Sequence, residues 1–358
     1  MTDEPLGSHV LELEVVDVID ETSDARSLVF KAPDGPQDAA IPADRLRYAP
    51  GQFLTLRVPS DRTGSVARCY SLCSSPFTDD ALTVTVKRTA EGYASNWLCD
   101  NAHPGMKMHV LAPSGTFVPK TFDTDFLLLA AGSGITPMLA ILKSALTEGS
   151  GKVTLVYANR DEKSVIFAKA LRELAAKYPD RFTAVHWLES VQGLPSASAM
   201  SELIAPFTAR EAFICGPGPF MAAAEEALKS SGAAAERIHI EVFKSLESDP
   251  FAAVVIASDD TDDGDEGPAT AIVTLDGDTH EISWPRGAKL LDVLLAKGLD
   301  APFSCREGHC GACAVVAKSG EVEMEVNDVL EQQDLDEGLI LACQAHPRSD
   351  SVEVTYDE

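Results

Sequence analysis

The sequence predicts a multidomain chain with an antiparallel β-barrel, then an α/β unit built on a parallel sheet, then a small unit rich in cysteine. Its 358 residues exceed the length of about 100–200 residues that one domain usually has. Short strands with turn signals fill the first third of the chain, and strands alternate with helices in the second. An acidic segment separates these two parts from the cysteine-rich end. Three folded units are therefore expected.

Residues 8–120 are expected to form the barrel. Leu11, Leu13 and Val15 alternate with glutamates, which is typical of a half-buried strand. Further strands are predicted at 53–58 and 82–86, with turn signals at Pro50-Gly51, Pro104-Gly105 and Pro113-Ser114-Gly115. Many short strands separated by turns indicate a small barrel.

Residues 121–250 are expected to form the α/β unit. The apolar run at 126–129 is typical of a strand that is buried on both faces. Strands alternating with helices indicate βαβ units and a parallel sheet. The remaining strands are predicted at 153–157, 182–188, 213–215 and 238–243, and the helices at 138–146, 165–177 and 221–228.

Residues 251–268 are predicted to be an acidic linker, because the segment 257–268 has six acidic residues and no large apolar side chain. The last unit, residues 269–358, follows it. The whole chain carries a net charge of −27, which excludes a basic nucleic-acid binder and disfavours an anionic membrane surface. The chain shows no secretory signal and no apolar stretch near the roughly 18 residues of a transmembrane helix. A cytoplasmic protein without membrane insertion is expected.

Two thirds of the excess negative charge lies in residues 259–358, which have 24 acidic and 6 basic residues. Acids near the cysteines, Glu307 and Asp328 among them, are expected to face a partner with a basic patch. The alternative is a solvated acidic surface.

Four cysteines of the last unit, Cys305, Cys310, Cys313 and Cys343, have the spacing C-x4-C-x2-C with a distant fourth member. This is the ligand spacing of a [2Fe–2S] cluster, and Gly308 and Gly311 allow the loop to curl around it. A structural zinc site prefers two C-x2-C pairs, and only one is present. The other cysteines, Cys69, Cys73, Cys99 and Cys215, lack a ligand spacing and are expected to be core thiols.

Two glycine-bearing turns each follow a predicted strand and open a helix. In the first, Gly132-x-Gly134, Thr136 is expected to cap the helix and Pro137 to occupy its first turn. The second is Cys215-Gly216-Pro217. Either turn alone could be merely structural. Because the carboxyl ends of parallel strands share one edge, the pair predicts a dinucleotide site there.

The order Arg68-x-Tyr70-Ser71, Gly92-x-x-Ser95, Gly132-x-Gly134 and Cys215-Gly216 resembles the ferredoxin–NADP⁺ reductase superfamily. With the cysteine unit appended, the chain is similar to reductases of multicomponent oxygenases. The resemblance implies a plant-type ferredoxin of α+β β-grasp fold. It also implies an oxidoreductase that passes electrons from NADH through FAD and a [2Fe–2S] cluster to a terminal oxygenase.

The whole-chain resemblance favours a steroid hydroxylase system with a Rieske-type oxygenase, and hence a role in steroid and lipid degradation. The reductase of another ring-hydroxylating or phenylacetyl-CoA-type oxygenase is the alternative. A stand-alone flavin reductase and a non-catalytic iron–sulfur redox sensor also remain open. A monomer is expected.

The resemblance also implies roles for individual residues. Ser71, Cys215 and Glu241 are the expected catalytic residues, near the flavin N5 and the nicotinamide. The expected flavin contacts are Arg68, Tyr70, Ser71, Val86, Lys87, Gly92 and Ser95; the expected dinucleotide contacts are Gly132, Gly134, Thr136, Pro137, Cys215, Gly216 and Pro217. Gly92 and Ser95 offer a second phosphate contact, which favours FAD over FMN. Phe243 is expected to cover the flavin, although an ordinary edge strand would also explain Glu241 and Phe243.

NADH is favoured over NADPH. Arg160 follows the strand at 153–157, where it could hold a 2′-phosphate, but Asp161 and Glu162 beside it would repel one.

Overall fold

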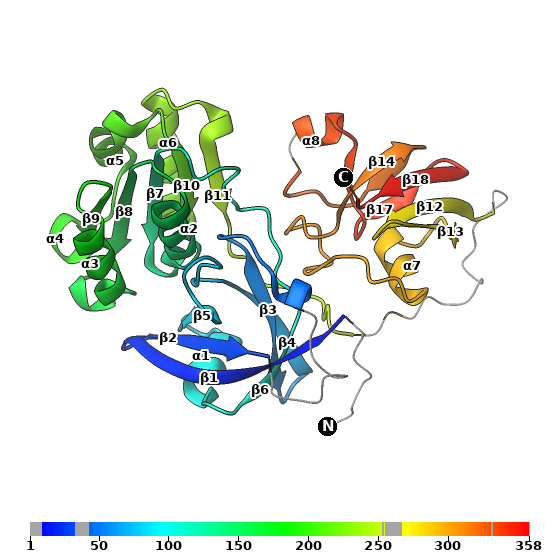
Figure 1. Cartoon of the computed structure of the whole chain (residues 1–358), viewed down its shortest axis with the longest axis horizontal. Helices are drawn as coiled ribbons and strands as arrows, with labels where there is room; N and C mark the ends of the chain where they lie inside the picture. The colour runs from blue at the N-terminus through cyan, green and yellow to red at the C-terminus, as the bar shows by residue number, and fades with distance from the viewer. Residues whose placement is uncertain (1–8, 33–42, 253, 255–266, 331, 358) are drawn as a thin grey trace.

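The computed structural model describes residues 9–32, 43–252, 254, 267–330 and 332–357, and these form three sheet-based units (Figure 1). Of the predicted acidic linker 251–268, residues 253 and 255–266 lie outside the described residues. Within the described ranges, no helix is both long and apolar enough to cross a membrane.

The first unit is a six-stranded antiparallel sheet in the order β4-β3-β6-β1-β2-β5. An isolated bridge between Leu72 and Val84 joins its two edges, so the sheet closes into the predicted barrel. Apolar side chains such as Leu13, Leu28 and Leu54 fill its interior. The elements are β1 (Leu11–Thr22), β2 (Ala25–Lys31), β3 (Phe53–Ser60), β4 (Gly64–Ser71), β5 (Leu82–Lys87), α1 (Tyr93–Asn101) and β6 (Lys107–Val110).

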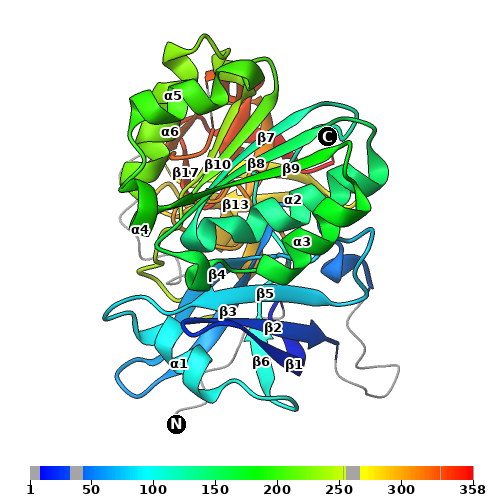
Figure 2. The same ribbon diagram turned by 90° about the vertical axis from the view of Figure 1, so that its left-hand side faces the viewer.

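The second unit is the predicted parallel sheet; its five strands lie in the order β11-β10-β7-β8-β9. Alternate residues of β7 serve two cores: Leu128 packs with the helices α2 and α3, and Leu129 with α5 and α6 on the other face (Figure 2). The elements are β7 (Phe126–Ala131), α2 (Ile135–Glu148), β8 (Val153–Asn159), α3 (Ala168–Lys177), β9 (Phe182–Leu188), α4 (Glu189–Gln192), α5 (Ala197–Ile204), β10 (Glu211–Cys215), α6 (Gly218–Ser230) and β11 (Ile238–Glu241).

The start of α2 differs from the prediction. A 3-10 turn at Gly132–Gly134 precedes the helix, which begins at Ile135. Thr136 is therefore inside the helix and is not its cap; its Oγ1 donates to the Ser133 carbonyl at 3.0 Å. Pro137 is the third residue of the helix, which is within its first turn as predicted. Proline is tolerated there because the first N–H groups of a helix have no intrahelical acceptor.

The third unit is a five-stranded mixed sheet in the order β13-β12-β18-β14-β16, with a separate β15-β17 pair. The parallel pairing of β12 with β18, the packed helix α7 and the buried Trp284 give the expected α+β unit. The elements are β12 (Ala269–Leu275), β13 (Asp278–Trp284), α7 (Leu290–Ala296), β14 (Ala314–Ser319), β15 (Val322–Met324), α8 (Gln332–Asp336), β16 (Leu339–Leu341), β17 (Ala345–Pro347) and β18 (Ser351–Thr355).

The barrel contacts both other units (Figure 1). Its Phe53 and Leu111 belong to the same apolar core as Phe303 and Cys305 of the third unit. On the other side, Ser75 bonds to Ser144 of α2 at 2.8 Å, a fully buried contact. The end of β4 lies where all three units meet, because its Ser71 lines one cavity with Glu241 of the second unit and Cys305 of the third.

Candidate functional site

A cavity of about 300 Å³ lies beside the ends of β4 and β5, against the first turns of α1 and α2. Eight of the predicted site residues line it: Arg68, Tyr70, Ser71, Lys87, Gly92, Ser95, Thr136 and Phe243. The structure thus brings together residues that are up to 175 positions apart in the sequence.

Two features of this cavity fit a flavin nucleotide. Ser71 is only 3% exposed, and its hydroxyl has no hydrogen-bond partner among the described residues, which indicates a place for a ligand atom. Gly92 immediately precedes α1. A side chain at this position would clash, because a Cβ there would lie 2.9 Å from Ser95 Oγ. The open N–H groups of this helix start suit a phosphate.

The charge of the cavity fits the same ligand. Arg68 donates to the carbonyls of Ala67 and Leu246 at 2.6 and 3.2 Å, which fixes its guanidinium at the cavity wall. Burial lowers the pKa of Lys87, an effect that the nearby Asp24 opposes. Burial raises the pKa of Tyr70, which therefore stays neutral. Val86, by contrast, points into the barrel core and does not line the cavity.

The predicted dinucleotide turns meet at the carboxyl edge of the parallel sheet. A Cβ on Gly134 would lie 2.1 Å from the Cys215 carbonyl oxygen, and one on Gly216 would lie 2.9 Å from Ala131 Cβ. Only glycine allows the two strand ends to approach this closely. Gly132 has a positive φ of 53°, and its carbonyl accepts from the Tyr157 hydroxyl at 2.9 Å. Pro217 stands immediately before α6.

Cys215 and Glu241 end neighbouring strands and are register partners in the pairing of β10 with β11. Cys215 is fully buried, and burial raises the pKa of its thiol well above the usual value. Burial also raises the pKa of Glu241, to about 7, so this carboxyl is poised to hold or release a proton near neutrality. The strand ends at Glu241, two residues earlier than predicted, because the chain then leaves the sheet towards the third unit.

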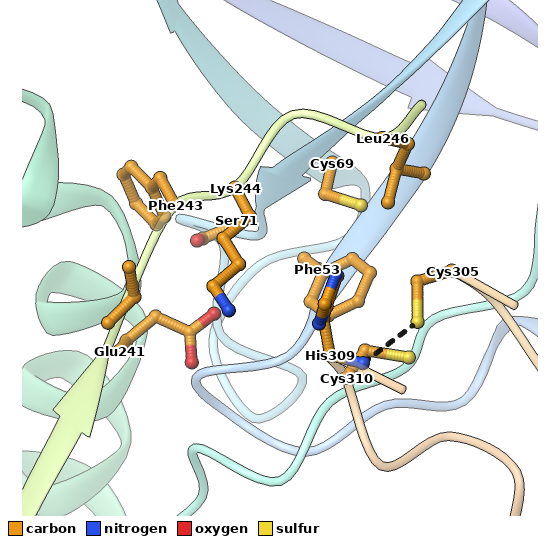
Figure 3. A pocket seen from close by; sticks show the side chains of 11 residues that line it. Phe53, Cys69, Ser71, Glu241, Phe243, Lys244, Leu246, Cys305, His309 and Cys310 are labelled. Carbon is orange, nitrogen blue, oxygen red and sulfur yellow. Dashed lines mark hydrogen bonds between the residues drawn. The ribbon is translucent and has the colours of Figure 1, made fainter. Parts of the chain in front are cut away.

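A second, smaller cavity of about 40 Å³ joins the flavin-type site to the cysteine loop (Figure 3). Ser71, Glu241 and Phe243 line one part of it, and Cys305 and Cys310 line another. Phe243 is 47% exposed and lines both cavities.

The four predicted ligand cysteines are all buried in the third unit. They lie in two hydrogen-bonded pairs, Cys305 with Cys310 and Cys313 with Cys343. The Cys310 contact, with backbone N–H groups, lowers the pKa of Cys305 to about 6 despite its burial. In the described part of the chain, no three His, Cys, Asp or Glu side chains converge as ligands of one metal ion.

Two pairs of thiolates nevertheless fit a [2Fe–2S] cluster, because it contains two irons and takes four cysteine ligands. The loop backbone is shaped for the same purpose. Gly308 and Gly311 have positive φ values of 78° and 70°, and the Glu307 and His309 N–H groups each donate to Cys305 Sγ at 3.4 Å.

Several contacts at this junction were not predicted from the sequence. Cys69, predicted to be a core thiol, lines both cavities, and its Sγ lies 3.4 Å from Thr55 Oγ1. Its place between Arg68 and Tyr70 was the available signal. Glu307 and Asp328, which were expected to face a partner, also make contacts within the chain, with Ser248 and Lys244 respectively. The Asp328 side chain stays 40% exposed, whereas that of Glu307 is 15% exposed. Cys73 and Cys99 are buried as expected.

Three sites meet at one junction: a flavin-type cavity, a dinucleotide-type strand edge and a four-cysteine loop. Together they define a nicotinamide-dependent flavin and iron–sulfur oxidoreductase. Three family models match the same three units. They are the oxidoreductase FAD-binding domain at residues 12–118, the oxidoreductase NAD-binding domain at 128–226 and the 2Fe-2S iron-sulfur cluster binding domain at 273–348.

The chain belongs to the family of the reductase components of multicomponent oxygenases, as the resemblance implied. It is 79% identical to the ferredoxin reductase component of 3-ketosteroid-9-alpha-monooxygenase from Mycolicibacterium smegmatis, with 100% of both chains covered. It is 35% identical to a subunit of 1,2-phenylacetyl-CoA epoxidase from Escherichia coli, covering 96% of this chain and 97% of that one. The solved structure of phthalate dioxygenase reductase has the same fold, with a TM-score of 0.55 at 23% identity, covering 97% and 98%.

Proposed function

We propose that this chain is the reductase component of a 3-ketosteroid 9α-monooxygenase, which takes electrons from NADH and delivers them to a Rieske-type terminal oxygenase. The identity of 79% over the full length supports the steroid assignment. The observation that supports the electron-transfer role is the smaller cavity, which Ser71 of the flavin-type site lines together with Cys305 and Cys310 (Figure 3). The eight free cysteines suit a reducing cytoplasm.

The site residues have separate roles in binding the dinucleotide, the flavin and the cluster. Gly134 and Gly216 let the ends of β7 and β10 approach closely and so form the edge at which a dinucleotide would bind, bordered by Cys215 and Glu241. Arg68 and the start of α1 hold the flavin phosphates, and the Ser71 hydroxyl is free to bond to the flavin ring. Bound FAD supplies the change from a two-electron hydride to single electrons. The two cysteine pairs would hold a [2Fe–2S] cluster, which accepts one electron at a time.

The purified protein should contain FAD and two irons per chain, and NADH should bleach both the flavin and the cluster absorption. With a Rieske-type 3-ketosteroid oxygenase added, NADH should drive steroid hydroxylation. Zinc in place of iron, or a protein without flavin, would contradict the cofactor assignment. Equal support of a phenylacetyl-CoA-type oxygenase would contradict the steroid assignment alone. Reduction by NADH without delivery to any oxygenase would favour a redox sensor.

The preference for NADH is supported by the position of Arg160. This residue follows β8 directly, but its guanidinium pairs with Asp24 in the β1–β2 turn of the barrel at 2.7 Å. The pairing neutralises the cation that a 2′-phosphate would need, and Asp161 and Glu162 add negative charge beside it.

Asp24→Asn should therefore improve the use of NADPH. We expect kcat/KM for NADPH to rise about 5-fold relative to that for NADH, as the loss of an exposed ion pair of about 1 kcal/mol allows. Asp20→Asn is the matched control, because Asp20 lies on β1, four residues before Asp24, and pairs with a different arginine, Arg26. An unchanged ratio, or an equal rise in the control, would show that Asp24 does not restrain Arg160.

A further inference from the structure

The chain segment 242–250 connects the flavin-type site to the third unit, and we call it the strap. It leaves β11 after Glu241, and its Phe243 and Lys244 line both cavities. It then passes Leu246, which lies near Cys69 at the wall of the smaller cavity (Figure 3). The same segment therefore borders the flavin-type site and the cysteine loop.

Glu307, two residues after the ligand Cys305, holds the strap. Its Oε1 accepts hydrogen bonds from the Glu247 N–H at 2.9 Å, the Ser248 N–H at 2.6 Å and the Ser248 hydroxyl at 2.7 Å. The Glu307 side chain is only 15% exposed. Hydrogen bonds to an ionised carboxylate are about twice as strong as bonds between neutral groups. This carboxylate is thus a firm connection between the cluster loop and the strap.

Neighbouring contacts support the same junction. Lys244 of the strap donates to Asp328 at 2.5 Å, and the same carboxylate oxygen lies 2.7 Å from His309 Nδ1. On the barrel side, a fully buried bond of 2.7 Å joins Thr55 Oγ1 to Ser304 Oγ. Glu307 differs from Asp328, the other carboxylate that contacts the strap, because it lies inside the ligand loop, between Cys305 and Cys310.

We propose that Glu307 is a positioning residue for electron transfer: it fixes the cluster loop against the flavin-type site through the strap. This inference rests on the proposed electron-transfer function. The bound flavin and cluster would supply the electron-transfer chemistry, and Glu307 would neither gain nor lose a bond or a proton in it. Its effect is on the separation and orientation of the two sites, because Cys305 and Cys310 form a wall of the cavity that Ser71 also lines.

The test uses the full-length protein with its cofactors and follows its reduction by NADH in a rapid-mixing spectrometer. In Glu307→Ala, reduction of the flavin should keep its rate, whereas reduction of the cluster should slow about 10-fold, equivalent to about 1.4 kcal/mol. Ser248→Ala removes one of the three donors and should slow the same step less. Glu353→Ala is the control, because it removes an equal charge from an exposed site on β18 and should change neither rate.

Hydrogen exchange supplies an independent readout. The Glu247 and Ser248 amides should exchange faster in Glu307→Ala, with little change in the amides of β12. The double variant Glu307→Ala/Ser248→Ala should reduce its cluster no more slowly than Glu307→Ala alone, because both substitutions remove the same Glu307–Ser248 contact. Unchanged exchange would show that the contact is absent, and faster exchange with an unchanged cluster rate would show that it does not position the loop; either overturns the proposal.

Two further outcomes are informative. If Glu307→Ala loses its cluster on purification, Ser248→Ala decides, because it leaves the ligand loop intact; a wild-type rate of cluster reduction in that variant would overturn the proposal. If NADH fails to reduce the flavin of the wild-type protein, the proposed function is wrong. If the wild-type protein reduces both flavin and cluster and the variants do so at the same rates, the proposed function stands and only the role of Glu307 is wrong.

Discussion

Replacement of Cys310 by alanine should abolish cytochrome c reduction and oxygenase support, while NADH-driven ferricyanide reduction continues near the wild-type rate. Cys310 is one of the four buried thiols and is paired with Cys305 at the wall of the shared cavity. A [2Fe–2S] cluster needs all four thiolates, and metal binding contributes to the folding of a small metal-binding unit. The iron content and the cluster absorption should both be lost.

The flavin and nicotinamide steps should survive because they belong to units with cores of their own. The barrel is filled by residues such as Leu13 and Leu54, and the parallel sheet by residues such as Leu128 and Leu155. Cys99→Ala is the control: it removes a buried thiol of the barrel that is not a predicted ligand and should keep both activities. Wild-type cytochrome c reduction in Cys310→Ala would mean that electrons do not pass through the cluster.

The fold could be predicted to this extent because its strongest signals are local. The apolar residues of β7 are adjacent in sequence and all buried, and the C-x4-C-x2-C spacing lies within nine residues. The glycines at 132, 134 and 216 mark turns whose geometry depends on neighbouring strands alone. Local patterns of this kind indicate strands, turns and ligand loops without knowledge of how the units pack.

The contacts between units could not be predicted in this way. Thr55 and Ser304 are 249 residues apart, and nothing in either segment indicates that their hydroxyls meet. Glu307 has the composition of a surface acid, and its burial depends on where the strap runs. Cys69 has the sequence signature of a core thiol, yet it lines cavities that exist only once the barrel, the strap and the third unit are assembled.

Helix boundaries show the same limit on a smaller scale. Thr136 has the residue type of a helix cap, and Pro137 that of a first turn. The 3-10 turn at Gly132–Gly134 starts the helical winding earlier, so the hydroxyl of Thr136 bonds backwards to Ser133 instead. Gly134 belongs both to this turn and to the contact between the two strand ends.

Gly134→Ala should slow hydride transfer from NADH to the flavin about 100-fold, the effect expected of a misplacement of about 1 Å at a reacting centre. The backbone of Gly134 has ordinary helical angles, with φ −61° and ψ −8°, so alanine meets no conformational strain there. The added Cβ would instead lie 2.1 Å from the Cys215 carbonyl oxygen and 2.4 Å from its carbon. Both are backbone atoms that end β10, so the strand end and the nicotinamide site beside it must shift.

Gly218→Ala is the matched control for this steric effect. Gly218 is also a glycine at a helix start, the first residue of α6, but a Cβ there meets no atom within 4 Å. It should therefore keep the wild-type rate of hydride transfer. Reduction of both variants by dithionite should be normal, because the flavin cavity and the cysteine loop contain neither glycine. Equal rates of NADH oxidation in Gly134→Ala and Gly218→Ala would mean that the nicotinamide does not bind against the contact between Gly134 and Cys215.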